Sequence, residues 1–441
     1  MSNANEEGVS DTGVKPTVNV RLRERQVLFV APDTEGTRKW GVYGCPDMYR
    51  AADGSIVVYD PGNMDTYDRD AGAMVEPVAF RSVDNGKTWE SVASQEYGRP
   101  AKVFTLSDGA QVQFRTKSPP VDLRAAGLRP EHIVITPNEC GLLGLFRHGD
   151  IPLAARTFEV RYREAGATTW LSSDGVFDMP ELYVGAVVKG KTDAAVWPDV
   201  TPNFDCLDYT MTGLHMGCTG QEALVEADDG VWISAIYETV PTERNARYFA
   251  QLHCIASADK GRTWRGRGCI FDLREQTTFG ATEEFSMIRQ GSEIVCVDRT
   301  DCATTFDPHR GTVLARSADN GFTWSKPEVV ASSSVTPHLV RLGNGVAALV
   351  FGRPGVHVQF SSDGCRSWNA LTSLIGKTKE EELAAGRDLM DAMYIDTVSY
   401  SNTRTVTTGP DRFLVLYTDF KYEGQKRKAL VVQEVMVAPV V

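Results

Sequence analysis

A group of histidine, glutamate and cysteine residues around position 215 has side chains that could support acid–base or metal chemistry. His215 precedes Glu222 by seven residues, and an imidazole with a carboxylate can exchange protons with a ligand or bind it. Cys206 and Cys218 flank the histidine, but these three residues lack the regular spacing of zinc ligands, so we expect no metal and no other cofactor. Further along the chain, His338 is another ligand-binding candidate in a predicted inner strand.

A recurring octet, Ser-x-Asp-x-Gly-x-Thr-Trp, defines the elements that must position such side chains. Asp and Asn hydrogen-bond to their own turn and Gly accepts a positive φ, so each octet predicts a tight hairpin turn. The Trp is expected to bury its ring against the sheet below. Three copies are intact and the fourth has Cys for Gly and Ser for Thr; they begin at Ser82, Ser257, Ser317 and Ser361. Such internal repeats indicate an architecture of repeated β-hairpins.

These octets resemble the Asp-box of the sialidase-like superfamily, whose members fold as six-bladed β-propellers. The resemblance extends from about Gln26 to the C-terminus and implies one all-β propeller domain over residues 26–441, after a flexible segment at 1–25. Strand Gln26–Val30 is expected to complete the last blade with strand Leu430–Val437, which closes the ring. The octet aspartates are expected to be structural because Asp-boxes lie away from the ligand face; they are Asp84, Asp259, Asp319 and Asp363.

Octet spacing defines the remaining organisation of the domain. Spacings of 60 and 44 residues between the last three octets fit propeller blades. The first two octets are 175 residues apart, and we assign the surplus to insertions near 116–155 and 186–217, with a seventh blade as the alternative. A third insertion near 373–397 contains the capping box Thr378-Lys379-Glu380-Glu381, which predicts a helix reaching about Asp391.

The resemblance also implies a catalytic set. Sialidases use a tyrosine nucleophile polarised by a glutamate, and a neutral phenol avoids the repulsion that a carboxylate would meet beside an anionic sugar. Tyr400 matches the nucleophile segment, with Tyr394 as its rival. Glu284 matches the polarising glutamate, and Glu283 replaces it if the register slips.

An aspartate acid/base is implied in the loop before the first octet. Asp70 is our candidate, and Asp65 and Asp68 compete with it. A dry pocket that raises the pKa of one of these carboxyl groups would distinguish the acid. The neighbouring Arg69 is a candidate for substrate binding.

Three arginines clamp the substrate carboxylate in sialidases, because guanidinium–carboxylate pairing is bidentate and orienting. Arg299 and Arg353 match two of them. The third stands in a Tyr-Arg-Ile-Pro stretch, and this chain has Tyr43-Gly44-Cys45-Pro46 there; Arg50 lies on the wrong side of the proline to replace it. Losing one of the three clamp arginines costs about 2 kcal/mol or more of binding free energy for the substrate carboxylate. This favours a sugar other than sialic acid, such as a uronic acid, rhamnose or another deoxy sugar.

The composition indicates which binding partners and which cellular compartment to expect. A net charge of −12 argues against nucleic acid and anionic membranes, and no apolar run reaches the length of a membrane span. Nine cysteines without a CxxC pair indicate buried free thiols in a reducing compartment. The polar start lacks the features of a secretory signal, so we expect a cytoplasmic protein, or a periplasmic or secreted one if a leader has been removed.

Three functions remain open. The leading expectation is an exo-acting glycoside hydrolase that cleaves a terminal, acidic or deoxy sugar from an oligosaccharide or polysaccharide. The second is a polysaccharide lyase that abstracts the proton beside a uronate carboxylate and eliminates the glycosidic oxygen. The third is a glycan-binding propeller without catalysis, which the lost clamp arginine favours.

Overall fold

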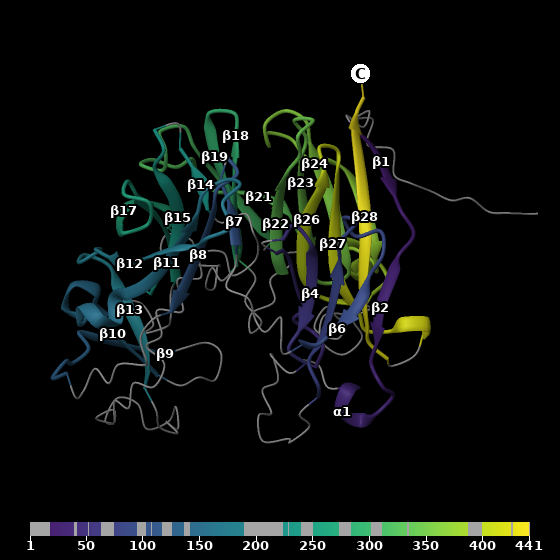
Figure 1. Cartoon of the computed structure of the whole chain (residues 1–441), viewed down its shortest axis with the longest axis horizontal. Helices are drawn as coiled ribbons and strands as arrows, with labels where there is room; N and C mark the ends of the chain where they lie inside the picture. Colours follow the sequence, from purple (N-terminus) through teal and green to yellow (C-terminus); the bar gives the residue numbers. More distant parts are fainter. Residues whose placement is uncertain are drawn as a thin grey trace, which may run out of the picture.

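A computed structural model provides the structure of this chain (Figure 1). The structure describes residues 18–38, 42–51, 53–62, 75–94, 103–106, 108–116, 126–135, 142–188, 224–227, 229–239, 250–272, 284–300, 311–332, 335–386, 399–424 and 427–440. Antiparallel β-hairpins form nearly all of it, so the all-β expectation is confirmed. In the described part, no helix is both long and apolar enough to span a bilayer.

Three sheets repeat one four-stranded antiparallel order, in which each strand pairs with the next along the chain. Their strands are β3 (Asp47–Arg50), β4 (Ile56–Asp60), β5 (Val78–Ser82) and β6 (Glu90–Val92); β18 (Phe285–Gln290), β19 (Glu293–Arg299), β20 (Thr312–Ser317) and β21 (Glu328–Ala331); and β22 (Val335–Arg341), β23 (Ala347–Gly352), β24 (Val356–Ser361) and β25 (Asn369–Ile375).

An eight-stranded sheet joins two further groups of four antiparallel strands. They are β7 (Val103–Thr105), β8 (Gln111–Thr116), β11 (Thr157–Arg163) and β12 (Leu171–Phe177), and β14 (Val225–Glu226), β15 (Trp232–Thr239), β16 (Ala250–Ser257) and β17 (Thr263–Phe271). A short parallel pairing of β12 with β17, which places Phe177 opposite Trp264, joins the two groups.

The last sheet combines both ends of the described chain. It contains β26 (Ser399–Gly409), β27 (Arg412–Asp419) and β28 (Ala429–Pro439), and β28 also pairs with β1 (Val18–Leu22) and β2 (Gln26–Val30). The expected pairing of residues 26–30 with the last strand is therefore present, with Gln26 opposite Val432. The flexible segment expected at 1–25 ends too late, because alternating Val18, Val20 and Leu22 pack as a strand against the core.

All four octets form the hairpin between the third and fourth strands of a group, and each begins on the last residue of the third strand. The Asp319 carboxylate accepts hydrogen bonds from the Ser317 hydroxyl (2.8 Å) and from the backbone N–H and hydroxyl of Thr323 (2.9 and 2.6 Å). The other three octet aspartates accept equivalent hydrogen bonds, so the carboxylate oxygens stabilise each turn. The octets also fill the space between sheets: a Cβ on Gly86, where φ is +82°, would lie 2.4 Å from Leu414 of β27.

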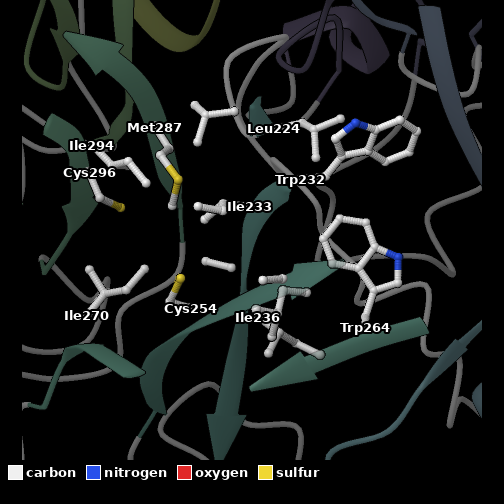
Figure 2. Packing of buried hydrophobic residues seen from close by; sticks show 14 of the residues in the cluster. Leu224, Trp232, Ile233, Ile236, Cys254, Trp264, Ile270, Met287, Ile294 and Cys296 are labelled. Atoms are coloured by element: carbon white, nitrogen blue, oxygen red, sulfur yellow. The ribbon is translucent and has the colours of Figure 1, made fainter. Parts of the chain in front are cut away.

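Buried apolar side chains fill the layers between neighbouring groups. Figure 2 shows side chains from β15, β16 and β17, such as Trp232, Cys254 and Trp264, facing Met287 and Cys296 from β18 and β19. Trp264 is fully buried and its indole N–H donates to the Gly261 carbonyl oxygen at 3.0 Å. Cys254, Cys296 and Cys365 are buried thiols outside any disulfide, as expected, whereas Cys45 and Cys269 are only half-buried.

The first strands of successive groups lie side by side, in the order β14, β18, β22, β26 and β3. Antiparallel strands alternate in direction, so the starts of first strands and the ends of second strands meet at one edge. We call this the proximal edge, and the octets occupy the opposite, distal edge. In Figure 1 the proximal edge faces down, toward the short helix α1 (Glu35–Arg38).

A small extra sheet projects from the proximal edge beside β15, at the lower left of Figure 1. Its strands are β9 (His132–Ile135), β10 (Leu142–Arg147) and β13 (Tyr183–Val188), and the 3-10 helices η1 (His148–Asp150) and η2 (Leu153–Arg156) follow β10. The insertion expected at 116–155 thus contains strands rather than loop alone. Most of the insertion expected at 186–217 lies outside the described residues.

The third insertion contains helix α3 (Lys379–Ala384), and Thr378 and Glu381 form the expected capping box. The helix stops seven residues before Asp391, because Gly386, with φ +71°, ends it. The remaining short helix, η5 (Tyr422–Gly424), lies between β27 and β28.

Candidate functional site

A glutamate and an arginine meet at the proximal edge of the β18–β21 sheet. Glu284 stands immediately before β18 and Arg299 ends β19, so the antiparallel pairing brings them together although they are fifteen residues apart. Arg299 donates to Oε2 of Glu284 at 3.1 Å, and the Thr336 backbone N–H donates to the same oxygen at 2.6 Å. Within the described residues Oε1 of Glu284 has no hydrogen-bond partner, so it can accept a proton or a hydrogen bond from a ligand.

A buried aspartate supports this pair from the other face of the strand. Oδ1 of Asp298 accepts hydrogen bonds from the backbone N–H groups of Arg299 (2.7 Å) and Glu284 (3.2 Å), and from the Tyr237 hydroxyl (3.3 Å). Asp298 is fully buried, and burial raises the pKa of its carboxyl group well above the ordinary value. No local sequence pattern predicts the Tyr237–Asp298 hydrogen bond, because the two residues lie in different sheets.

Arg353 follows β23 at the same edge and is only 3% exposed. Its turn is held by His357, whose ring contacts the Pro354 carbonyl oxygen at 3.0 Å and the Ser373 hydroxyl at 2.9 Å. A Cβ on Gly355 would lie 2.7 Å from Nε2 of His357, so only glycine fits this turn. The packing therefore fixes the backbone that carries the Arg353 guanidinium.

Three non-glycine residues at this edge have a strained backbone. Tyr43, Thr336 and Arg353 have φ values of +50°, +42° and +44°, in a region that non-glycine residues seldom adopt. Tyr43 precedes β3, whereas Thr336 and Arg353 belong to the β22–β25 sheet, and Thr336 is the residue whose N–H meets Glu284. Strained non-glycine residues cluster at functional sites, where surrounding contacts hold them.

Arg404 is a site residue that sequence reasoning missed. Its Nε lies 3.1 Å from Oδ1 of Asp47, and the two side chains are 10% and 15% exposed. Asp47 begins β3, directly after the Tyr43–Pro46 stretch that lacks the expected arginine. A guanidinium from β26 is therefore placed beside that stretch. Arg50, in contrast, bonds to Gly54, Asn85 and Thr407 at the distal edge, as expected for a structural residue.

A second buried charge pair lies between the first and last sheets. Burial raises the pKa of Asp60 to about 6 and lowers the pKa of Lys428 to about 7. The Lys428 ammonium group donates to the Val42 carbonyl oxygen and lies 4.6 Å from the centre of the Phe420 ring. Both groups are at most 4% exposed, so we assign them to holding the residues before β3 rather than to ligand binding.

The remaining sequence candidates divide into three kinds. Tyr400 lies in β26 opposite Thr418, so its backbone is at the proximal edge, while its side chain is outside the described part. His338 is 0% exposed within β22, and its expected ligand role stays a prediction. The other candidates lie outside the described residues, namely Asp70, Arg69, His215 and Glu222, together with the alternatives Asp65, Asp68, Glu283 and Tyr394.

Metal chemistry finds no support in the described part of the chain, which contains no group of three or more His, Cys, Asp or Glu side chains arranged to hold an ion. Instead, cationic groups are prominent at the proximal edge. Arg299, Arg353 and Arg404 stand on three adjacent sheets, and all three are largely buried. Desolvated guanidinium groups favour an anionic or strongly polar ligand.

Comparison with known proteins supports the fold and leaves the activity open. No protein-family model matches the sequence, and neither does any curated protein. A protein of unknown function from Dyadobacter fermentans is similar in structure, with a TM-score of 0.53 and 15% identity over 95% of this chain and 99% of that one. The NanB sialidase from Streptococcus pneumoniae matches 94% of this chain and 70% of its own, with a TM-score of 0.48 and 12% identity.

A Penicillium chrysogenum alpha-L-arabinanase matches 93% of this chain and 98% of its own, with a TM-score of 0.44 and 13% identity. Identities this low indicate shared architecture, and architecture alone does not assign an activity.

Proposed function

We propose that this protein is an exo-acting glycoside hydrolase of sialidase-like form, which removes a terminal acidic or deoxy sugar from a glycan. The observation that carries the proposal is the Glu284–Arg299 pair at 3.1 Å, on the edge where the strands bearing Tyr400, Arg353 and Arg404 also begin or end. In this proposal six groups of strands, two of them within the eight-stranded sheet, are the blades of a closed propeller, and β1 and β2 complete the last blade on β28.

Tyr400 is the proposed nucleophile, and Glu284 is its base. Arg299 and the Thr336 N–H both occupy Oε2 of Glu284, which leaves Oε1 to take the phenol proton. The tyrosine oxygen then bonds to the anomeric carbon while the glycosidic bond breaks, and Asp70 donates a proton to the departing oxygen. Asp70, now a carboxylate, then deprotonates a water molecule that bonds to the anomeric carbon while the bond to the tyrosine oxygen breaks, and Glu284 returns its proton to that oxygen.

The proposed substrate carries a carboxylate or a comparable polar group near the anomeric carbon. In this proposal Arg299 and Arg353 are two of the arginines that clamp the carboxylate, and the support for a third is that the Arg404 guanidinium lies near the stretch where the expected arginine is missing. Asp47 neutralises part of the Arg404 charge, so the site is less cationic than three unpaired arginines would make it. This favours a uronic acid or deoxy sugar over sialic acid.

Turnover of aryl glycosides of glucuronic acid, rhamnose and sialic acid tests the proposal. Tyr400→Phe should lower the rate on the preferred sugar on the order of 10³-fold. Glu284→Gln should lower it by about 10²-fold or more, while it keeps an acceptor for the Thr336 N–H. Tyr162→Phe, a tyrosine of β11 whose ring stacks on Trp232, should leave the rate unchanged.

Full activity in the Tyr400→Phe protein would refute this mechanism. A product that absorbs in the ultraviolet through a new double bond would instead identify the lyase alternative. Saturable sugar binding without any product, from the same panel and from acidic oligosaccharides, would identify a binding protein.

A further inference from the structure

Asp298 is a buried acid that the proposed mechanism does not use. It lies on β19, and its side chain faces the β14–β17 strands, whereas the side chain of its neighbour Arg299 faces β22. Its Oδ1 is the shared acceptor for both site residues and for Tyr237. Its Oδ2 is fully buried and has no hydrogen-bond partner within the described residues.

No cation in the described part compensates a charge on Asp298. The guanidinium group of Arg299 turns to Glu284, and Asp298 forms no ion pair with any described Lys, Arg or His. The charged or titratable groups that face it are the Tyr237 hydroxyl from β15, the Glu284 carboxylate before β18 and the Cys296 thiol two residues away on β19. The Tyr237 hydroxyl donates a hydrogen bond to Oδ1, but none of these three groups is a cation, and a buried carboxylate without a cationic partner is expensive.

We propose that Asp298 is a positioning residue that works as a neutral carboxylic acid, fixing the backbone of Glu284 and Arg299 while adding no charge to the site. Glu284 then holds the one negative charge opposite Arg299. The cationic character of Arg299 is kept for an anionic sugar, a consequence that rests on the proposed function. Burial raises the pKa of Asp298, which agrees with the geometry.

Two variants distinguish the role of Asp298 as a hydrogen-bond acceptor from the effect of its charge. Asp298→Asn keeps an acceptor for the backbone N–H groups and cannot ionise, whereas Asp298→Ala removes the acceptor. In the unfolded chain the aspartate ionises near pH 4, while the folded protein keeps it protonated, so folding stability is highest below that pH and falls as pH rises toward the folded pKa. The melting temperature of Asp298→Asn should therefore rise relative to the wild type between pH 4 and pH 7.

The experiment measures melting temperature from pH 4 to 8 for the wild type and both variants, together with infrared difference spectra at pH 7. We expect the carbonyl band of a protonated carboxyl group in the wild type and its loss in Asp298→Asn. We also expect a lower melting temperature for Asp298→Ala at every pH. A pH-independent offset between Asp298→Asn and the wild type, or no protonated-carboxyl band, would overturn the proposal. These readouts need no substrate, so they stand or fall apart from the hydrolase.

Sugar binding tests whether Asp298 positions Glu284 and Arg299. Binding of free glucuronic acid and sialic acid, followed by calorimetry at pH 7, should be retained in Asp298→Asn and weakened at least tenfold in Asp298→Ala. Equal loss in both variants would mean that the charge of Asp298, and not its acceptor, serves the site. If the wild type binds neither sugar, the hydrolase proposal loses its ligand while the infrared result still decides the protonation state.

Discussion

Asp47 and Arg404 are 357 residues apart in the chain, and their side chains form an ion pair at 3.1 Å where β3 lies beside β26. The first group of strands thus contributes the carboxylate and the last group contributes the guanidinium. Sialidases carry an arginine in the first group, in the stretch that corresponds to Tyr43–Pro46. This pair links the first and last sheets and places a guanidinium at the proximal edge.

The Asp47–Arg404 pair should couple strongly in a double-mutant cycle. Both side chains are largely buried, so Asp47→Ala or Arg404→Ala breaks a buried ion pair and should cost about 3 kcal/mol of unfolding free energy each. The double variant should lose less than the sum, which urea unfolding measures. Strict additivity would mean that the two charges do not interact in solution.

The Arg353 turn should depend on Gly355. Gly355→Ala forces a Cβ against His357 and the Ile375 carbonyl oxygen at 2.7 Å, with φ at +70°, so we expect a loss of about 2 kcal/mol or more. Gly345→Ala is the matched control, since its φ is +89° and its Cβ would meet nothing within 4 Å. Calorimetric unfolding compares them, and equal losses would show that the His357 contact does not constrain the turn.

Acid should destabilise the protein through His148. This side chain is 1% exposed, its ring nitrogens have no hydrogen-bond partner within the described residues, and burial lowers its pKa to about 4. The folded-state pKa is below the unfolded value of 6.5, so stability is complete above pH 6.5 and is lost as the pH falls toward 4. At ~1.4 kcal/mol per pKa unit the loss approaches 3 kcal/mol.

His148→Leu should flatten this acid dependence of the unfolding free energy, measured by urea titration between pH 4 and 7. His132→Asn is the control, because His132 is exposed and contacts the Tyr183 hydroxyl at 3.3 Å. An unchanged slope in His148→Leu would assign the acid sensitivity to other groups.

The octet tryptophans should differ in what their indole N–H contributes. Trp264→Phe removes a bond to the Gly261 carbonyl oxygen from a fully buried ring and should cost about 2 kcal/mol. The indole nitrogen of Trp89 is buried without a partner in the described part, so Trp89→Phe should cost less than about 1 kcal/mol. Thermal unfolding ranks the two, and the reverse order would contradict these assignments.

Local sequence determined much of this protein. Octets specify their own turns because each Asp accepts hydrogen bonds from residues within four positions of it in the chain. The capping box at Thr378 is equally local, and the alternation of apolar residues indicates the paired strands. Glu284 and Arg299 could be linked from the sequence because a single hairpin brings them together. The helix end before Asp391 and the strand at 18–22 were misjudged, since one glycine and one short apolar alternation decide them.

Only the tertiary structure decided the contacts that cross between sheets. The Asp47–Arg404 pair, the Tyr237–Asp298 bond and the Thr336 N–H on Glu284 join residues from different groups of strands, and no local spacing reports them. The physical reason is that a hairpin sets its own register, whereas the neighbours of a sheet depend on how every apolar layer in the molecule packs.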